Sequence, residues 1–202
     1  MTRLLFRLAL SGIACAPLLA SPAGAASPEN NFFGMVVSKG AAACLPKAKA
    51  RVTIAPRGTV ENMHVEAFGL PKNTGFDLFV IQVPGPPFGM SWYQGDLQTD
   101  SDGIAVGDFV GRFSKETFVV APGTASAPNT FPSSPFPDAT ANPPTNPLQM
   151  YHLGIWFNSP ADAKAAGCPT AETPFNGEHT AGIQVLNTAD FPDLSGPLLK
   201  IP

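Results

Sequence analysis

Short apolar runs separated by Gly, Pro, Asn and Asp dominate the chain between residues 32 and 120. The runs are rich in β-branched and aromatic residues and lack the periodicity of a helix, so they predict successive antiparallel strands. The predicted strands cover residues 33–38, 51–55, 60–68, 76–83, 91–99, 104–113 and 117–120.

Two of these runs indicate how the strands are buried. In residues 60–68 apolar and polar side chains alternate, which predicts one buried and one solvated face. The buried set is Met63, Val65 and Ala67, and the solvated set is Asn62, His64 and Glu66. Residues 76–83 are apolar on both faces apart from Asp77 and Gln82, which is typical of a central strand in a sandwich.

The chain changes composition after residue 120. Residues 121–149 contain eight prolines, so they predict a Pro-rich connection that either crosses between sheets or serves as a recognition loop. A strand over residues 151–157 follows. Ser159, which precedes a proline, has the residue type of a helix N-cap, and Gly167 is a natural helix end. A last strand is predicted over residues 181–186.

The first 26 residues have the features of a signal peptide. Arg3 and Arg7 precede a mostly apolar stretch at residues 8–20, and residues 23–25 are small enough for signal peptidase. We therefore expect cleavage of residues 1–26 and a secreted or periplasmic protein.

The mature chain, residues 27–202, has the length of one domain with a well-buried core, so we expect a single domain. No later apolar run approaches the roughly 20 residues that cross a bilayer, so no transmembrane segment is expected in it. Asp and Glu number 15 against 12 Lys and Arg, and two of the arginines lie in the leader, so the exported chain is acidic. This charge argues against nucleic acid as a partner.

Cysteine usage predicts a covalent link. Cys15 lies in the leader, which leaves Cys44 and Cys168 in the mature chain. In an oxidising compartment two such thiols are expected to form a disulfide. A bridge that closes so long a loop contributes about 4 to 5 kcal/mol in the chain-entropy model.

Histidines provide one candidate chemistry. His64, His152 and His179, with Glu178 beside the last, would supply ligands for copper or zinc if the fold brought them together. Their spacing contains no H-x-H or H-x-x-x-H pair, so they form no local chelate. His64 is expected on the solvated face of its strand, and His152 is out of phase with the apolar residues that follow it.

Aromatic residues provide the other candidate. Trp92 and Tyr93 are adjacent on one predicted strand and Trp156 and Phe157 on another, so one ring of each pair should face the core and the other should face outward. An outward ring would stack on a sugar or anchor a peptide, whereas the alternative for Trp92, Tyr93 and Trp156 is structural packing.

Several segments resemble known sequences. The run AFGLPKNTGFDLFV at residues 67–80, followed by GDL at 95–97 and TDSDG at 99–103, resembles exported bacterial immunoglobulin-like β-sandwich domains. The segments WFNSP at 156–160 and TPFNGEHTAG at 173–182 are similar to uncharacterised secreted bacterial proteins. The resemblance implies a fold and no catalytic residue, because these are turn and packing motifs.

Together these observations predict an all-β, antiparallel, immunoglobulin-like sandwich with one short helix and a long Pro-rich loop. We expect an exported, non-enzymatic binding or interaction module for a protein or carbohydrate ligand, without a cofactor. The alternative is a copper or zinc protein, or a metalloenzyme, that uses the histidines.

Overall fold

A computed structural model describes residues 30–116, 148–173 and 180–201. Strands dominate this part of the chain, which contains one α-helix and one 3-10 helix. In chain order the elements are β1 (Asn31–Val37), β2 (Lys49–Arg57), β3 (Val60–Phe68), β4 (Gly75–Ile81), β5 (Ser91–Gln98), β6 (Ala105–Gly111), β7 (Lys115–Glu116), β8 (Leu148–Gln149), β9 (His152–Phe157), α1 (Pro160–Ala165), β10 (Gln184–Asn187) and η1 (Pro197–Lys200).

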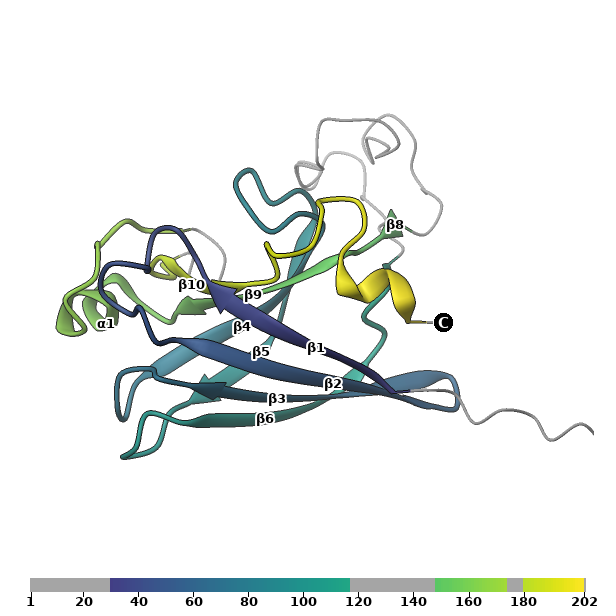
Figure 1. Cartoon of the computed structure of the whole chain (residues 1–202), viewed down its shortest axis with the longest axis horizontal. Coiled ribbons are helices and arrows are strands. Elements are labelled where there is room, and N and C mark those ends of the chain that lie inside the picture. Colours follow the sequence, from purple (N-terminus) through teal and green to yellow (C-terminus); the bar gives the residue numbers. More distant parts are fainter. Residues whose placement is uncertain (1–29, 117–147, 174–179, 202) are drawn as a thin grey trace, which may run out of the picture.

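Eight of the strands form one antiparallel sheet in the order β5-β4-β9-β10-β1-β2-β3-β6. Strand β1 joins the two halves, because its residues 31–35 pair with β2 whereas Val36 and Val37 pair with β10. The sheet curls so that its end strands, β5 and β6, approach each other, and the result is nearly a barrel (Figure 1). The all-β antiparallel prediction is confirmed, whereas an immunoglobulin-like sandwich is not.

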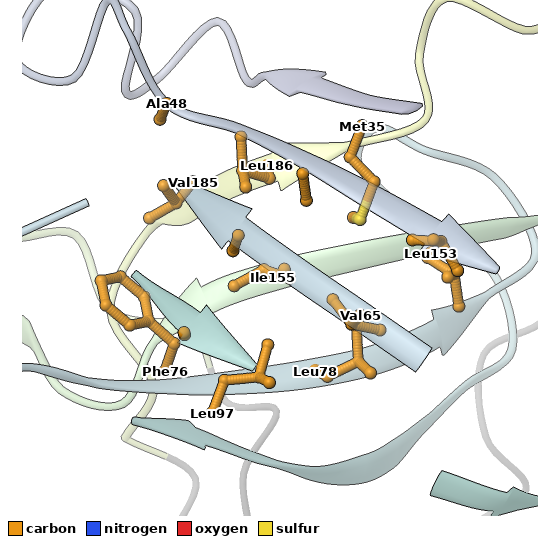
Figure 2. Packing of buried hydrophobic residues seen from close by; sticks show 14 of the residues in the cluster. Met35, Ala48, Val65, Phe76, Leu78, Leu97, Leu153, Ile155, Val185 and Leu186 are labelled. Carbon is orange, nitrogen blue, oxygen red and sulfur yellow. The ribbon is translucent and has the colours of Figure 1, made fainter. Parts of the chain in front are cut away.

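The main core lies between the two halves of the curled sheet (Figure 2). The alternation predicted for β3 is confirmed, because Met63, Val65 and Ala67 are buried and Asn62 is exposed. Strand β4 is buried on both faces, as predicted for a central strand, and it lies between β5 and β9. The labelled core side chains in Figure 2 include Met35, Val65, Phe76, Leu78, Leu97, Leu153, Ile155 and Val185.

The predicted disulfide is present. Cys44, in the turn after β1, is bonded to Cys168, just beyond α1, with 5.3 Å between the two Cα atoms and a sequence separation of 124 residues. The helix α1 also begins as predicted, since the Ser159 hydroxyl oxygen accepts from the Asp162 backbone N–H at 3.1 Å. The bridge therefore ties the β1–β2 connection to the segment that follows β9.

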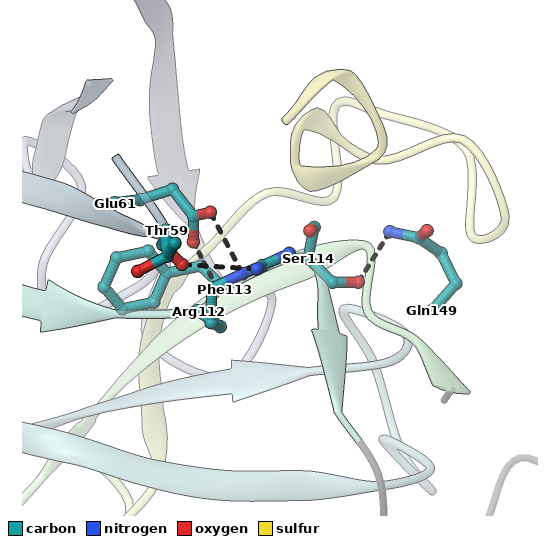
Figure 3. A network of polar contacts seen from close by, with 6 residues as sticks. All are labelled: Thr59, Glu61, Arg112, Phe113, Ser114 and Gln149. Atoms are coloured by element: carbon teal, nitrogen blue, oxygen red, sulfur yellow. Dashed lines mark hydrogen bonds and ion pairs between the residues drawn. The ribbon is translucent and has the colours of Figure 1, made fainter. Parts of the chain in front are cut away.

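A buried carboxylate organises the end of β6 (Figure 3). Glu61 is only 4% exposed, and it accepts a hydrogen bond from the Phe113 backbone N–H at 3.0 Å and pairs with the Arg112 Nε at 3.2 Å. Arg112 also donates through Nη1 to the Thr59 carbonyl oxygen at 3.3 Å. Next along the chain, the Ser114 carbonyl oxygen accepts from the Gln149 Nε2 at 2.7 Å.

Most of the predicted Pro-rich connection, and the strand predicted at residues 117–120, lie outside the described residues. The described ends on either side are paired, because β7 and β8 are antiparallel neighbours with Lys115 opposite Gln149. The last predicted strand is shifted, since residues 184–187 form β10 whereas Ala181 makes an isolated bridge with Thr173. No helix in the described part of the chain has the length and apolar character needed to span a membrane.

Candidate binding groove

A groove of about 840 Å³ lies on the outward side of the half-sheet that contains β1, β10 and β9. Three chain segments supply most of its lining: residues 36–40 at the end of β1, the loop 82–90 between β4 and β5, and residues 183–193 around and after β10. Trp156 on β9 and Thr173 complete it. Its described apolar lining residues are Val36, Val37, Pro84, Pro86, Phe88, Trp156, Ile183 and Ala189. The volume lies within the range of about 300 to 1,000 Å³ that is common for small-molecule sites.

Two amide side chains on β10 hold the loop 82–90 in place. The Gln184 Nε2 and the Asn187 Nδ2 both donate to the Pro84 carbonyl oxygen, at 3.1 and 3.3 Å. Asn187 also donates to the Gln184 Oε1 at 2.9 Å, and its Oδ1 accepts from the Ala189 backbone N–H at 3.1 Å. One buried asparagine therefore connects two walls of the groove, which favours a preformed site.

The loop itself is fastened at its base by Gln82. The Gln82 backbone N–H donates to the Met90 carbonyl oxygen at 2.9 Å, and its Oε1 accepts from the Met90 N–H at 2.6 Å. At the far end Phe88 has a positive φ of 60°, which is uncommon for a residue other than glycine. This conformation places the Phe88 ring on Trp156, with the ring centroids 5.2 Å apart.

Trp156 faces away from the main core, as the alternation along β9 predicted, yet it is 0% exposed. It belongs to a second apolar cluster with Phe79, Ile81 and Ala181, against which Phe88 packs. The sequence predicted the direction in which this indole points, but not that Phe88 would pack over it. Trp156 therefore lies at the base of the groove, packed beneath Phe88, and its role in ligand contact stays a prediction.

His152 supports the third wall of the groove from below. Its Nε2 lies 3.0 Å from the Asp193 carbonyl oxygen and its Nδ1 2.8 Å from the Thr188 Oγ1. A carbonyl oxygen only accepts, so Nε2 carries the proton and Nδ1 accepts from the Thr188 hydroxyl, whose oxygen accepts from the Leu153 N–H at 3.3 Å. Burial lowers the pKa of His152, so the neutral ring is favoured.

Three charged residues also line the groove: Lys39, Asp190 and Asp193. All three are exposed. The ion pairs within the described residues are His64 with Asp108 and Arg112 with Glu61, so none of these three charges is neutralised there.

The adjacent aromatic pair on β5 divides as predicted. Trp92 is half-buried against the main core, and its Nε1 donates to the Gln94 Oε1 at 3.3 Å. Tyr93 faces outward, is 45% exposed and donates its hydroxyl to the Asp96 Oδ1 at 2.6 Å. The pKa of Tyr93 is raised far above its usual range, mainly because part of the ring is buried and secondly because its hydroxyl is hydrogen-bonded to Asp96.

The histidines do not form a shared site among the residues that the structure describes. His64 lies on the outward face of β3, half-exposed, with its Nδ1 2.7 Å from the Asp108 Oδ1. His152 is in the other half of the sheet with both ring nitrogens engaged. His179 and Glu178 lie outside the described residues, and no group of three or more His, Cys, Asp or Glu side chains occurs within them. The copper or zinc alternative stays a prediction.

Comparison with known proteins found no matching family model, no matching curated protein and no matching solved structure. The groove therefore has to be interpreted from its own geometry. Sequence reasoning named Trp156 but missed the other groove residues, because they come from distant segments. One signal was available: the run Pro84-Gly85-Pro86-Pro87-Phe88 is a rigid loop that ends in an aromatic residue.

Proposed function

We propose that this chain is an exported binding module whose groove takes a small ligand with an apolar body. The observation that carries the proposal is the groove of about 840 Å³ with aromatic, proline and aliphatic lining residues. Ligand sites of this kind are mostly apolar with a few polar groups. The leader at residues 1–26 and the disulfide support export.

Preorganisation of the walls supports a binding role over a purely structural one. The hydrogen bonds of Gln184 and Asn187 to the Pro84 carbonyl oxygen hold the loop 82–90 in place without a bound ligand. A preformed site loses less conformational freedom when a ligand binds. Tyr93 is exposed but is not among the groove residues; its ring contacts Phe79, which in turn contacts Trp156. The carbohydrate-binding and peptide-binding variants therefore stay separate proposals for the surface around Tyr93, and the immunoglobulin-like relationship also stays a proposal.

The proposal can be tested with the neutral fluorescent probe N-phenyl-1-naphthylamine, titrated into the mature protein. The probe should bind with a saturable fluorescence increase, and Val36→Trp, which places an indole in the groove, should abolish that increase. Val106→Trp is the matched control, because Val106 is an outward valine on β6 that is not among the groove residues. Absence of saturable binding, or equal losses in both variants, would overturn the proposal.

A further inference from the structure

The groove has neutral and charged polar side chains; among the neutral ones are Ser38, whose hydroxyl donates to the Gln184 carbonyl oxygen, and Thr173. The side chains of Gln184 and Asn187 are committed to each other, to Pro84 and to Ala189. The charged groups of Lys39, Asp190 and Asp193 take part in neither of the two ion pairs of the described residues, although the Asp193 carboxylate acts electrostatically on the buried His152. The charges are therefore better placed than the amides to recognise the polar end of a ligand.

Carboxylates outnumber ammonium groups at this site. Asp190 and Asp193 both follow β10 on one wall, whereas Lys39 follows β1. The ring of Phe88 packs edge-to-face against the fully buried Trp156 and is itself half-buried at the groove. The face of an aromatic ring attracts a cation, so Phe88 is compatible with a positively charged ligand. The chain as a whole is also acidic, which raises the local concentration of cations.

We propose that the groove selects a ligand with a positive charge on an apolar body, that is, a hydrophobic amine. This inference rests on the proposed function. The ammonium group lies near Asp190 and Asp193 while the apolar body contacts Phe88 and Ile183, and Lys39 disfavours the cation. The selectivity is electrostatic, so it weakens as salt rises.

Three matched naphthalene probes test the inference: 1-naphthylmethylamine, which is cationic at neutral pH, 1-naphthalenemethanol, which is neutral, and 1-naphthoate, which is anionic. Each is titrated calorimetrically into the mature protein at low and at high salt. The amine should bind most tightly and the anion least. Removal of one exposed charge should change affinity by roughly two- to fivefold.

Variants assign the selectivity to the groove. Asp190→Asn combined with Asp193→Asn should remove the preference for the amine, and Lys39→Gln should strengthen it. Asp102→Asn is the control, because it removes a carboxylate from an exposed turn that is not part of the groove. A preference that survives the double variant, or that Asp102→Asn weakens equally, overturns the inference.

The outcomes separate this inference from the proposed function. If the three probes bind with equal affinity and Val36→Trp removes them all, the groove is a ligand site but the inference of a cationic ligand is wrong. If the anion binds most tightly, Lys39 dominates and the inference is again wrong. If none of the three probes binds although N-phenyl-1-naphthylamine binds saturably, the inference is wrong and the proposed function stands; if N-phenyl-1-naphthylamine does not bind either, both are wrong.

Discussion

The ring of Phe109 on β6 lies over the backbone of Gly95 on β5. A methyl group built on Gly95 would be 2.6 Å from the Phe109 Cε1, which is closer than side-chain carbons approach one another. These two strands are the ends of the eight-stranded sheet, and the ring of Phe109 packs against the core at the gap between them. Glycine at residue 95 thus allows the curled sheet to close through side-chain packing.

Gly95→Ala should therefore destabilise the protein by about 1 to 3 kcal/mol, the usual cost of overpacking, and the positive φ of 157° at Gly95 adds backbone strain in the same direction. Urea unfolding of the mature protein measures the change. Gly34→Ala is the matched control on another strand, because its nearest neighbour would be the Ala50 carbonyl oxygen at an ordinary 3.7 Å. If the two substitutions had equal effects, the contact between Gly95 and Phe109 would not be the cause.

Acid should weaken the protein through His152. Burial lowers the pKa of this residue from 6.5, so the unfolded chain binds more protons than the folded one below that pH. The free energy of unfolding should be level above pH 6.5 and fall below it, by at most about 1.4 kcal/mol per pH unit, until the folded-state pKa is passed.

Denaturant titrations at several pH values would measure this dependence. His152→Gln should reduce the fall between pH 6.5 and the folded-state pKa, whereas His64→Gln, which changes an exposed ring on β3, should leave it in place. If His152→Gln kept the full acid dependence, other groups would be responsible for it.

Asn187→Ala should loosen two walls of the groove together. The substitution removes one of the two donors to the Pro84 carbonyl oxygen, which keeps Gln184, and the acceptor for the N–H of the exposed Ala189. Loss of such hydrogen bonds costs about 0.5 to 1.5 kcal/mol each. Hydrogen exchange at the Ala189 amide should become faster, and binding of N-phenyl-1-naphthylamine should weaken. Asn62→Ala, on the exposed face of β3, should change neither measurement.

Loss of the disulfide should cost about 4 to 5 kcal/mol in the chain-entropy model. The double variant Cys44→Ala with Cys168→Ala removes the bridge without leaving a free thiol, and a shift of the unfolding midpoint measures the effect. A free-thiol assay on the denatured mature protein provides an independent check. Detection of two thiols would show that the bridge is not formed in the native protein.

Local pattern was enough to locate most strands and the capped helix. The alternation in residues 60–68 predicted the buried face of β3 because side-chain direction follows from strand geometry alone. Pattern could not predict that β1 pairs with β2 at one end and with β10 at the other, since pairing depends on residues more than 100 positions away. Because this long-range pairing decides whether the strands form two sheets or one nearly closed sheet, the sequence pattern could not distinguish a sandwich from the observed fold.

The same limit applies to the groove. Alternation predicted that His152 and Trp156 point away from the apolar set, but it gave no sign that the segment 188–193 and Phe88 would cover them. The groove residues come from strands and loops that are far apart in the sequence, and only the tertiary fold brings them together. Tyr93, Trp92 and the disulfide were easier to predict, because each depends on strand direction or on cysteine count.

The pairing of β7 with β8 has a practical consequence for protein engineering. It holds Lys115 and Gln149 opposite each other, so the two described ends of the intervening segment are neighbours. The entropic cost of closing a loop grows only slowly with its length. An epitope or a small folded domain could therefore be grafted between these strands, as a display site that leaves the sheet order unchanged.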